Sequence, residues 1–266
     1  MIINIVGGSG VMGSVHKPVF ESAGHKVIIS GRNSEISIEK ASEKSDLTII
    51  SVPINAVSDV VKKVAPYCKA IMDFTSLKAF PLKDMLNYSG KECEVAGLHP
   101  LYGKVKSIRG KTVVYCKTEK SGKKCGEIVN CLKMAGAQIK EMTPEEHDKN
   151  VVSINQALRI KELTTYIKTI KDECFSIKEM YDIAPPPTKV LIELCARQLN
   201  LNNDSMYVGI IKRDNFAEYF EKKFLDNFKL VGSDYEKIAS ELRKAFGSDF
   251  LKEMQEKAEK KIDNDA

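Results

Sequence analysis

The feature that most constrains this chain is a glycine-rich turn placed directly after its first apolar run. Residues 2–6 are typical of a buried strand, and Gly8-Ser9-Gly10-Val11-Met12-Gly13 then opens a helical pattern. Glycines at this spacing permit a tight turn and a close approach of the backbone to a pyrophosphate, which the helix N-terminus would face. The alternative is a glycine-rich turn that binds nothing. The strand–turn–helix context favours a dinucleotide site, with Gly8, Gly10, Val11, Met12 and Gly13 at the cofactor.

Strand-like and helical patterns alternate through residues 1–142. Seven strands are predicted, at 2–6, 26–30, 47–52, 70–74, 94–98, 112–116 and 137–141. Helical patterns lie between several of them, for example at 11–23 and 54–65. This alternation predicts a Rossmann-type α/β domain, in which helices cover both faces of a doubly wound, mainly parallel sheet.

The pattern changes at Thr143-Pro144-Glu145-Glu146, which has the form of a helix N-cap with a capping box. From there the sequence is helical almost throughout, at 144–182, 188–200, 204–230 and 234–262. We therefore predict two domains, a dinucleotide-binding domain at 1–142 and an all-α domain at 143–266. Long amphipathic helices with apolar faces left over commonly pair with a second subunit, so the helical domain is expected to bind substrate and form a homodimer.

Composition argues against several classes of protein. The formal charge of +5 arises from scattered lysines, without the basic stripe and interleaved aromatics that nucleic acid would require. Seven dispersed cysteines form no CxxC pair and show no metal-ligand spacing, which favours reduced thiols and no metal site. No apolar run approaches the roughly 20 residues of a membrane span. A soluble, cytoplasmic protein that binds small molecules is the expectation.

The residues after the second and third predicted strands bear on the choice of cofactor. An NAD-preferring site usually has Asp or Glu at the end of the second strand, where it accepts from the ribose 2′-hydroxyl. Here Ser30 and Arg32 stand in that region, which predicts NADP; NAD is the alternative if Arg32 is only a solvated cation. Ser51, Val52 and Pro53 are expected beside the nicotinamide ribose, although Pro53 could simply end a strand.

Two further loops leave the same edge of the predicted sheet and carry candidates for chemistry. Ser76 follows the fourth strand, and His99 follows the fifth. A serine hydroxyl can fix the tautomer of an imidazole, and the imidazole can then accept a hydroxyl proton while hydride leaves the same carbon. A lone loop histidine is more often structural, but its position at this edge and the nearby serine favour the catalytic interpretation.

Taken together, these segments resemble the prephenate/arogenate dehydrogenase family of tyrosine biosynthesis. The most specific match is Leu98-His99-Pro100-Leu101-Tyr102-Gly103. The others are 8–13, 51–54, 73–78, 145–150 and 156–158, which run in the family's order over most of the chain. The resemblance implies NAD(P)-dependent oxidative decarboxylation of prephenate or arogenate.

The resemblance also implies roles for individual residues. His99 matches the catalytic histidine, and Ser76 matches the serine that orients it. On the segment 189–197, Arg197 takes the role of the arginine that binds a substrate carboxylate, two helical turns after Lys189. Lys189, Gln156 and Arg159 are weaker substrate-side candidates. His147 also matches a family segment and could be functional or structural.

Other interpretations stay open at this point. One is a different NADP-dependent reductase with a helical domain, acting on an imine or a 3-hydroxy acid; another is a non-catalytic NADP-sensing protein. His16 and His25 are expected at the surface beside the first helix. No segment resembles an added chorismate mutase or regulatory domain, so feedback inhibition through such a domain is not expected.

Overall fold

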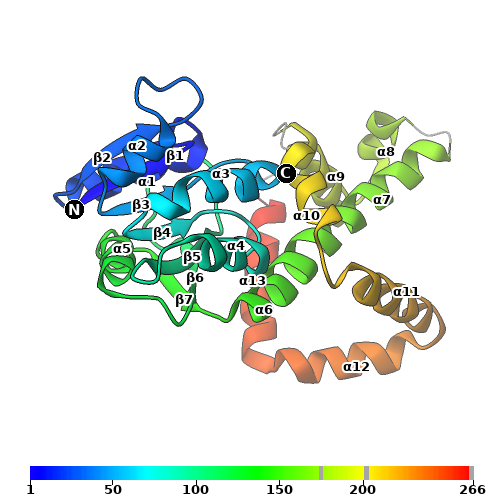
Figure 1. The fold of residues 1–266 in the computed structure, drawn as a ribbon. Helices are drawn as coiled ribbons and strands as arrows, with labels where there is room; N and C mark the ends of the chain where they lie inside the picture. The colour runs from blue at the N-terminus through cyan, green and yellow to red at the C-terminus, as the bar shows by residue number, and fades with distance from the viewer. Residues whose placement is uncertain (174–175, 201–203, 264–266) are drawn as a thin grey trace. The chain divides into compact units, whose positions relative to one another are not determined.

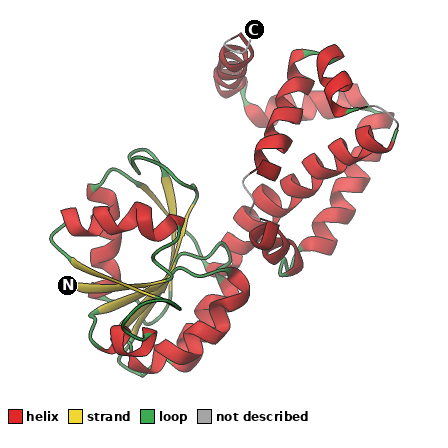
Figure 2. Cartoon of the chain, turned by 90° about the horizontal axis from the view of Figure 1, so that it is seen from above, coloured by secondary structure: helices red, strands yellow, loops and turns green. Residues whose placement is uncertain are grey.

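The computed structural model describes residues 1–173, 176–200 and 204–263 of the chain (Figure 1). Two compact units are present. The first comprises Met1–Val152 with Val208–Asp214, and the second comprises Ser153–Tyr207 with Asn215–Ala266. The first is an α/β unit and the second is helical (Figure 2), which confirms the predicted fold class.

A seven-stranded sheet forms the centre of the first unit, in the order β2-β1-β3-β4-β5-β6-β7. Its strands are β1 (Ile2–Val6), β2 (Lys26–Ser30), β3 (Leu47–Ile50), β4 (Ala70–Asp73), β5 (Glu94–Pro100), β6 (Thr112–Lys117) and β7 (Gln138–Glu141). All neighbours are parallel except β5 and β6. Since β1 lies between β2 and β3, the chain order reverses at β1. In doubly wound sheets, the crevice at the carboxyl ends of such strands is where ligands bind.

Helices cover both faces of this sheet because its central strands, such as β3 and β4, are buried on both sides. They are α1 (Val11–Ser22), α2 (Ile38–Glu43), α3 (Val57–Val64), α4 (Ala79–Tyr88), α5 (Lys123–Met134) and α6 (Pro144–His147), with short 3₁₀ turns η1 (Ile54–Ala56) and η2 (Ala65–Tyr67). Ile5 packs in the core cluster that includes α1 and α5, whereas its neighbour Val6 packs in the cluster that includes α3 and α4. This alternation is what a parallel sheet buried on both faces requires.

The second unit contains α7 (Arg159–Asp172), α8 (Ile177–Ile183), α9 (Pro186–Asn200), α11 (Ala217–Ser233), α12 (Tyr235–Phe246) and α13 (Ser248–Asp263). Helix α10 (Asp204–Lys212) begins in this unit and ends in the first. A small core joins α7 and α9 through Leu163, Ile167, Ile170, Ile192 and Cys195. Neither α11 nor α12 has a buried residue among those that the structure describes.

The predicted capping box at the start of α6 is present. Thr143 Oγ1 accepts from the Glu146 backbone N–H, and Glu146 Oε2 accepts from the Thr143 N–H. The long regular helix expected at 144–182 is not, because a π-helix runs over Asp148–Leu158 and α7 ends at Asp172. A second capping box, Ser176 with Glu179, starts α8.

The expectation that His16 and His25 are surface residues is wrong, since both are buried. His16 Nδ1 lies 2.8 Å from the Met12 carbonyl oxygen, and its Nε2 lies 3.0 Å from the Tyr102 hydroxyl. Burial lowers the pKa of His16 to about 4. His25 lies between the amino terminus and Cys131. Each ring has polar partners from distant segments, which a helix pattern alone does not reveal.

Among the described residues, none of the helices combines the length and the apolar character that crossing a membrane would need.

Candidate functional site

A cavity of about 580 Å³ opens at the carboxyl ends of β1, β2 and β3. Six of the residues predicted to bind a cofactor line it, namely Gly10, Ser30, Arg32, Ser51, Val52 and Pro53. The sequence interpretation missed other lining residues, among them Gly7, Ser9, Gly31, Asn33 and Ser34. The reversal point of the sheet and the glycine turn therefore meet at one cavity, as a dinucleotide site requires.

The glycines of the turn have two different roles, since Gly7 lines the cavity whereas Gly8 and Gly13 allow close packing. Gly7, one residue before the predicted fingerprint, has φ +78° and lines the cavity, and its N–H donates to the Ser30 carbonyl oxygen over 2.7 Å. Gly13 does not line the cavity, but a Cβ there would lie 2.0 Å from the Gly8 carbonyl oxygen. Gly8 itself has no room for a Cβ beside Ile29. Gly8 and Gly13 thus allow the turn and α1 to pack closely.

The first turn of α1 can receive an anion. Its N-cap is Gly10, which has no side chain to accept from the first backbone N–H groups of the helix. Such unsatisfied N–H groups at a helix N-terminus bind phosphate. Val11 is exposed and Met12 is half-buried, and neither side chain lines the cavity. Any contact of these two residues with a pyrophosphate would therefore come from the backbone.

Ser30 and Arg32 differ in what they can offer at this cavity. The Ser30 hydroxyl is buried and donates to Asn4 Oδ1 over 2.8 Å, so its hydrogen is not available to a phosphate. Arg32 is exposed and makes no hydrogen bond or ion pair with the residues described for its unit. Of the two predicted phosphate contacts, the guanidinium is the one that this geometry supports.

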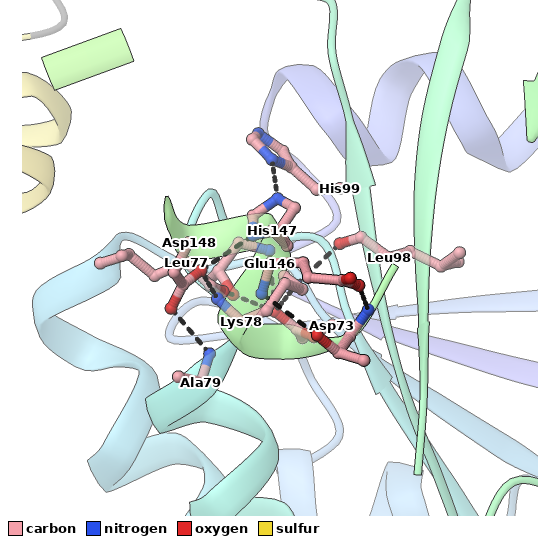
Figure 3. A network of polar contacts seen from close by, with 11 residues as sticks. Asp73, Leu77, Lys78, Ala79, Leu98, His99, Glu146, His147 and Asp148 are labelled. Atoms are coloured by element: carbon pink, nitrogen blue, oxygen red, sulfur yellow. Dashed lines mark hydrogen bonds and ion pairs between the residues drawn. The ribbon is translucent and has the colours of Figure 1, made fainter. Parts of the chain in front are cut away.

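A second set of polar residues lies farther along the same edge of the sheet, at the end of β5 (Figure 3). His99 is 4% exposed, and its Nδ1 lies 2.8 Å from His147 Nε2. His147 Nδ1 in turn lies 2.8 Å from Asp148 Oδ1. The Asp148 carboxylate accepts from the backbone N–H groups of Lys78 and Ala79 over 2.8 and 2.9 Å. Three side chains and the start of α4 form one buried chain of contacts.

The expected hydrogen bond between Ser76 and His99 is not formed in the structure. Ser76 lies half-buried in the loop after β4, and His147 occupies Nδ1 of His99 instead. The sequence signal for His147 was weak, since it stands 48 residues from His99. Its position in the first turn after the Thr143 cap, next to a carboxylate, was the available clue.

Behind His99 lies a buried ion pair that the sequence interpretation missed. Lys78 and Asp73 both have fully buried side chains, and Lys78 Nζ contacts Asp73 Oδ2. The ammonium also donates to the Leu98 carbonyl oxygen over 2.8 Å, one residue before His99. A Cβ at Gly97 would lie 2.9 Å from Lys78 Cδ, so the glycine leaves room for the lysine stem. Lys78 thereby joins the ends of β4 and β5.

The electrostatic environment keeps both histidines neutral near neutral pH. Burial lowers the pKa of His99 well below its usual value of about 6.5, with further lowering from His147 and Lys78. Burial also lowers the pKa of His147, against the opposing effect of its hydrogen bond to Asp148. A neutral imidazole has one ring nitrogen without hydrogen, so His99 can accept a proton.

The predicted substrate-side residues all lie in the second unit. Arg197 is exposed on α9 and makes no hydrogen bond or ion pair with the described residues of that unit. Lys189 Nζ lies 5.2 Å from the centre of the Tyr181 ring, a cation–π contact. Arg197 therefore has an uncommitted guanidinium, whereas Lys189 packs on an aromatic ring.

Arg159 and Gln156 have different surroundings. Arg159 Nη1 donates to Gln198 Oε1 over 3.2 Å, and Gln198 Nε2 donates to Thr164 Oγ1. Gln198 is buried and was not predicted. Gln156 Oε1 is buried without a hydrogen-bond partner among the described residues. A buried acceptor of this kind commonly marks a site for a water or a ligand.

Comparison with known proteins gives consistent results. A family model described as the nucleotide-binding domain of prephenate dehydrogenase matches residues 8–141, about half of the chain. The chain is 27% identical to a probable arogenate/prephenate dehydrogenase of Methanocaldococcus jannaschii, over 94% of this chain and 62% of that protein. It is 32% identical to the T-protein of Haemophilus influenzae, over 59% of this chain and 42% of that protein. The chain thus spans less than two thirds of the length of these relatives.

Solved structures share the fold over nearly the whole chain. A prephenate dehydrogenase from Aquifex aeolicus, in complex with hydroxyphenyl propionate and NAD⁺, has a TM-score of 0.65 and 20% identity, covering 96% of this chain and 98% of its own. An arogenate dehydrogenase from Synechocystis has a TM-score of 0.64 and 16% identity, covering 92% and 97%. At these identities the likeness concerns the fold.

Proposed function

Because this chain belongs to the prephenate dehydrogenase family, we propose that it catalyses NAD(P)-dependent oxidative decarboxylation of prephenate to 4-hydroxyphenylpyruvate or of arogenate to tyrosine. The observation that carries the proposal is the buried, neutral His99 on the same sheet edge, and in the same unit, as the dinucleotide cavity. Among the relatives, one is named for both substrates and two solved structures are named for one substrate each. The alternatives of another reductase or a nucleotide sensor have no comparable support.

The residues present fit a bound dinucleotide. Gly10 leaves the first N–H groups of α1 open, and Gly7, Ser51, Val52 and Pro53 line the adjoining cavity. When bound, the dinucleotide supplies the acceptor for the hydride that leaves C4 of the substrate ring, as CO₂ departs and the ring becomes aromatic. His99 accepts the C4 hydroxyl proton, and general-base help of this kind contributes about 10²–10⁴-fold. Ser76 stays a predicted residue of this site, although it makes no hydrogen bond to His99 in the structure.

One assay tests the proposed reaction. Steady-state rates are measured with prephenate and with arogenate, each in the presence of NAD and of NADP, by following the reduced nicotinamide. Turnover of at least one of the two substrates is expected, with release of CO₂ in equal amount. Absence of turnover with all four combinations, in protein that still binds a dinucleotide, contradicts the proposal and favours a nucleotide-binding protein without this activity.

NADP is proposed as the preferred cofactor because Arg32 is exposed at the cavity and no carboxylate is among the described residues that line it. Arg32→Ala is expected to raise the KM for NADP about 10- to 100-fold and to leave the KM for NAD nearly unchanged, since a charge-assisted hydrogen bond contributes ~1.5–3 kcal/mol. Asn33→Ala, a neutral change at the same cavity, is the matched control. Equal losses with both cofactors would exclude a contact of Arg32 with the 2′-phosphate.

Arg197 is proposed to bind a substrate carboxylate, with Lys189, Arg159 and Gln156 as further substrate-side residues. Because a guanidinium can hold a carboxylate through two hydrogen bonds, Arg197→Ala is expected to raise the substrate KM about 10- to 100-fold with little change in the KM for the dinucleotide. Arg243→Ala, at an exposed arginine of α12, is the control. An unchanged substrate KM would remove Arg197 from the binding site.

A homodimer through the C-terminal helices is proposed from the apolar residues that they expose. Tyr219, Phe228, Tyr235, Leu242 and Phe250 are each more than half exposed. Exposed apolar residues in such number mark a surface that another chain covers. Sedimentation equilibrium is expected to give twice the 29.7 kDa mass of one chain, and a single-chain mass at micromolar concentration would contradict the dimer.

A reducing, cytoplasmic location is proposed from the state of the cysteines. Cys68, Cys93, Cys116, Cys125, Cys131 and Cys195 are free thiols in the structure. Unpaired buried thiols are typical of proteins that work in a reducing compartment. Cell fractionation tests this proposal, and recovery of the protein outside the cytoplasmic fraction would contradict it.

A further inference from the structure

The contacts of His99 continue into the protein rather than ending at one partner (Figure 3). His99 and His147 are both buried, and their rings meet edge to face with centroids 5.0 Å apart. Asp148 lies beyond His147, and its two carboxylate oxygens accept from two successive backbone N–H groups. Those amides belong to Lys78 and Ala79, at the start of α4, so the carboxylate cannot turn away from His147 without losing both hydrogen bonds.

The Asp148 carboxylate is held in place by two backbone N–H groups, and it sets the direction of the hydrogen bonds that run through His147 to His99. Asp148 Oδ1 already accepts from the Lys78 N–H, so it faces His147 Nδ1 as an acceptor and Nδ1 must carry the hydrogen. A neutral imidazole has only one N–H, which leaves His147 Nε2 as an acceptor. His99 Nδ1 must then donate to it. The remaining ring nitrogen of His99, Nε2, is left without hydrogen.

We propose that His147 and Asp148 are positioning residues that hold His99 in the Nδ1–H tautomer, with Nε2 as its basic atom, and that stabilise the charge when Nε2 takes up a proton. This inference rests on the proposed function, because it concerns the base of that reaction. A carboxylate that orients a histidine and stabilises its protonated form is an arrangement known from other enzymes.

The proton balance of the step is simple. The substrate hydroxyl proton moves to His99 Nε2, which makes the ring a cation with hydrogens on both nitrogens. The Nδ1 hydrogen remains in the bond to His147 Nε2 or shifts onto it, and in either position the positive charge lies within reach of the Asp148 carboxylate. No further reactant takes part in this proton transfer, since the hydride goes to the nicotinamide.

Other charged groups near the two histidines act in known directions. Lys78 disfavours protonation of both rings, whereas Asp73 and Asp148 favour protonation of His147. Lys78 and Asp73 form an ion pair with each other. Asp148 is the charged group that bonds directly to one of the two histidines, through His147 Nδ1. Removing its charge should therefore make His99 harder to protonate.

Histidine NMR tests the tautomers without any substrate. The protein has only four histidines, so ¹⁵N-labelled imidazole signals can be assigned by single substitutions. In the unaltered protein, His99 is expected to show a protonated Nδ1 and a bare Nε2. A His99 that carries its hydrogen on Nε2 in the unaltered protein would overturn the proposal. In Asp148→Asn the amide oxygen can still accept from the Lys78 N–H and from His147 Nδ1, so the same His99 tautomer is expected there.

Kinetics provide the second readout. Asp148→Asn is expected to lower kcat about 10²–10⁴-fold and to move the acid limb of kcat/KM to lower pH, because the protonated form of His99 has lost its support. A merely structural defect would lower the rate equally at every pH. Glu145→Gln makes the same change of charge at an exposed position of α6 and is expected to leave the limb in place. An unmoved limb in Asp148→Asn would also overturn the proposal.

His147→Gln covers the case in which Asp148→Asn does not fold. The glutamine carbonyl can accept from His99 Nδ1, so the tautomer is expected to persist, but the amide cannot take a proton and the acid limb should still move to lower pH. An unmoved limb in this variant contradicts the proposal. If the unaltered protein shows the expected tautomer but turns over neither prephenate nor arogenate, the proposed function fails while the arrangement of the histidines stands.

Discussion

His99→Asn is expected to reduce turnover of prephenate or arogenate by at least about 10²–10⁴-fold, to near the background rate, while dinucleotide affinity stays within about twofold. An asparagine amide can accept a hydrogen bond from the substrate hydroxyl, but it cannot take the proton as hydride leaves. Dinucleotide binding should survive because His99 does not line the cavity between β1, β2 and β3.

Two measurements together check this result. Steady-state kinetics give the loss of kcat, and fluorescence titration of the reduced dinucleotide gives its Kd. His25→Asn is the matched control, since His25 is buried in the same unit but contacts the amino terminus and Cys131 instead of the site. Retained turnover in His99→Asn would remove this residue from the mechanism, and equal loss in His25→Asn would indicate a general effect of losing a buried histidine.

The parts of the site that the sequence could predict are those set by local pattern. The positions of the glycine turn after β1 and of the histidine at the end of β5 follow from the predicted strands and turns. They follow also from the rule that the carboxyl ends of parallel strands lie at one edge of a sheet. Arg32 is predicted at the cofactor site because it follows the second strand, and its side chain lines the cavity. These residues are positioned by the elements that carry them, with little dependence on distant packing.

The parts of the site that the sequence could not predict depend on contacts between distant segments. His147 reaches His99 because α6 brings residues 48 positions apart into contact, and a capping box indicates where a helix starts without indicating what it packs against. Ser76 stood closer in sequence and was the natural choice for the partner. The π-helix after α6 also lay outside what apolar periodicity can detect, because that periodicity assumes a regular helix.

Lys78 shows the same limit most clearly, since a lysine in a loop is ordinarily exposed. Here its side chain is fully buried between the ends of β4 and β5, paired with Asp73 and bonded to the Leu98 carbonyl oxygen. Lys78→Met is expected to destabilise the first unit by ~3–5 kcal/mol, because it leaves the Asp73 carboxylate buried without its partner. Lys83→Met, the same change at an exposed position of α4, should stay within about 0.5 kcal/mol of the unaltered protein.

The pH dependence identifies the cause of that loss. Burial raises the pKa of Asp73 even with Lys78 present, and loss of the ammonium should raise it further. A carboxyl whose pKa is higher in the folded chain than its unfolded value of about 3.9 binds protons preferentially to the folded state, so the free energy of unfolding falls as pH rises between the two values. The deficit of Lys78→Met should therefore be larger at pH 7 than at pH 5. Native-state hydrogen exchange of the β4 and β5 amides measures it at both values.

A double variant separates the lost charge from the lost packing. In Asp73→Asn/Lys78→Met neither charge remains, so the penalty for a buried unpaired carboxylate disappears and most of the loss should be recovered. The difference between pH 5 and pH 7 should vanish with it. If the double variant is as unstable as Lys78→Met alone, the lysine stabilises β4 and β5 through its stem and its bond to Leu98, and Asp73 is not the reason for its burial.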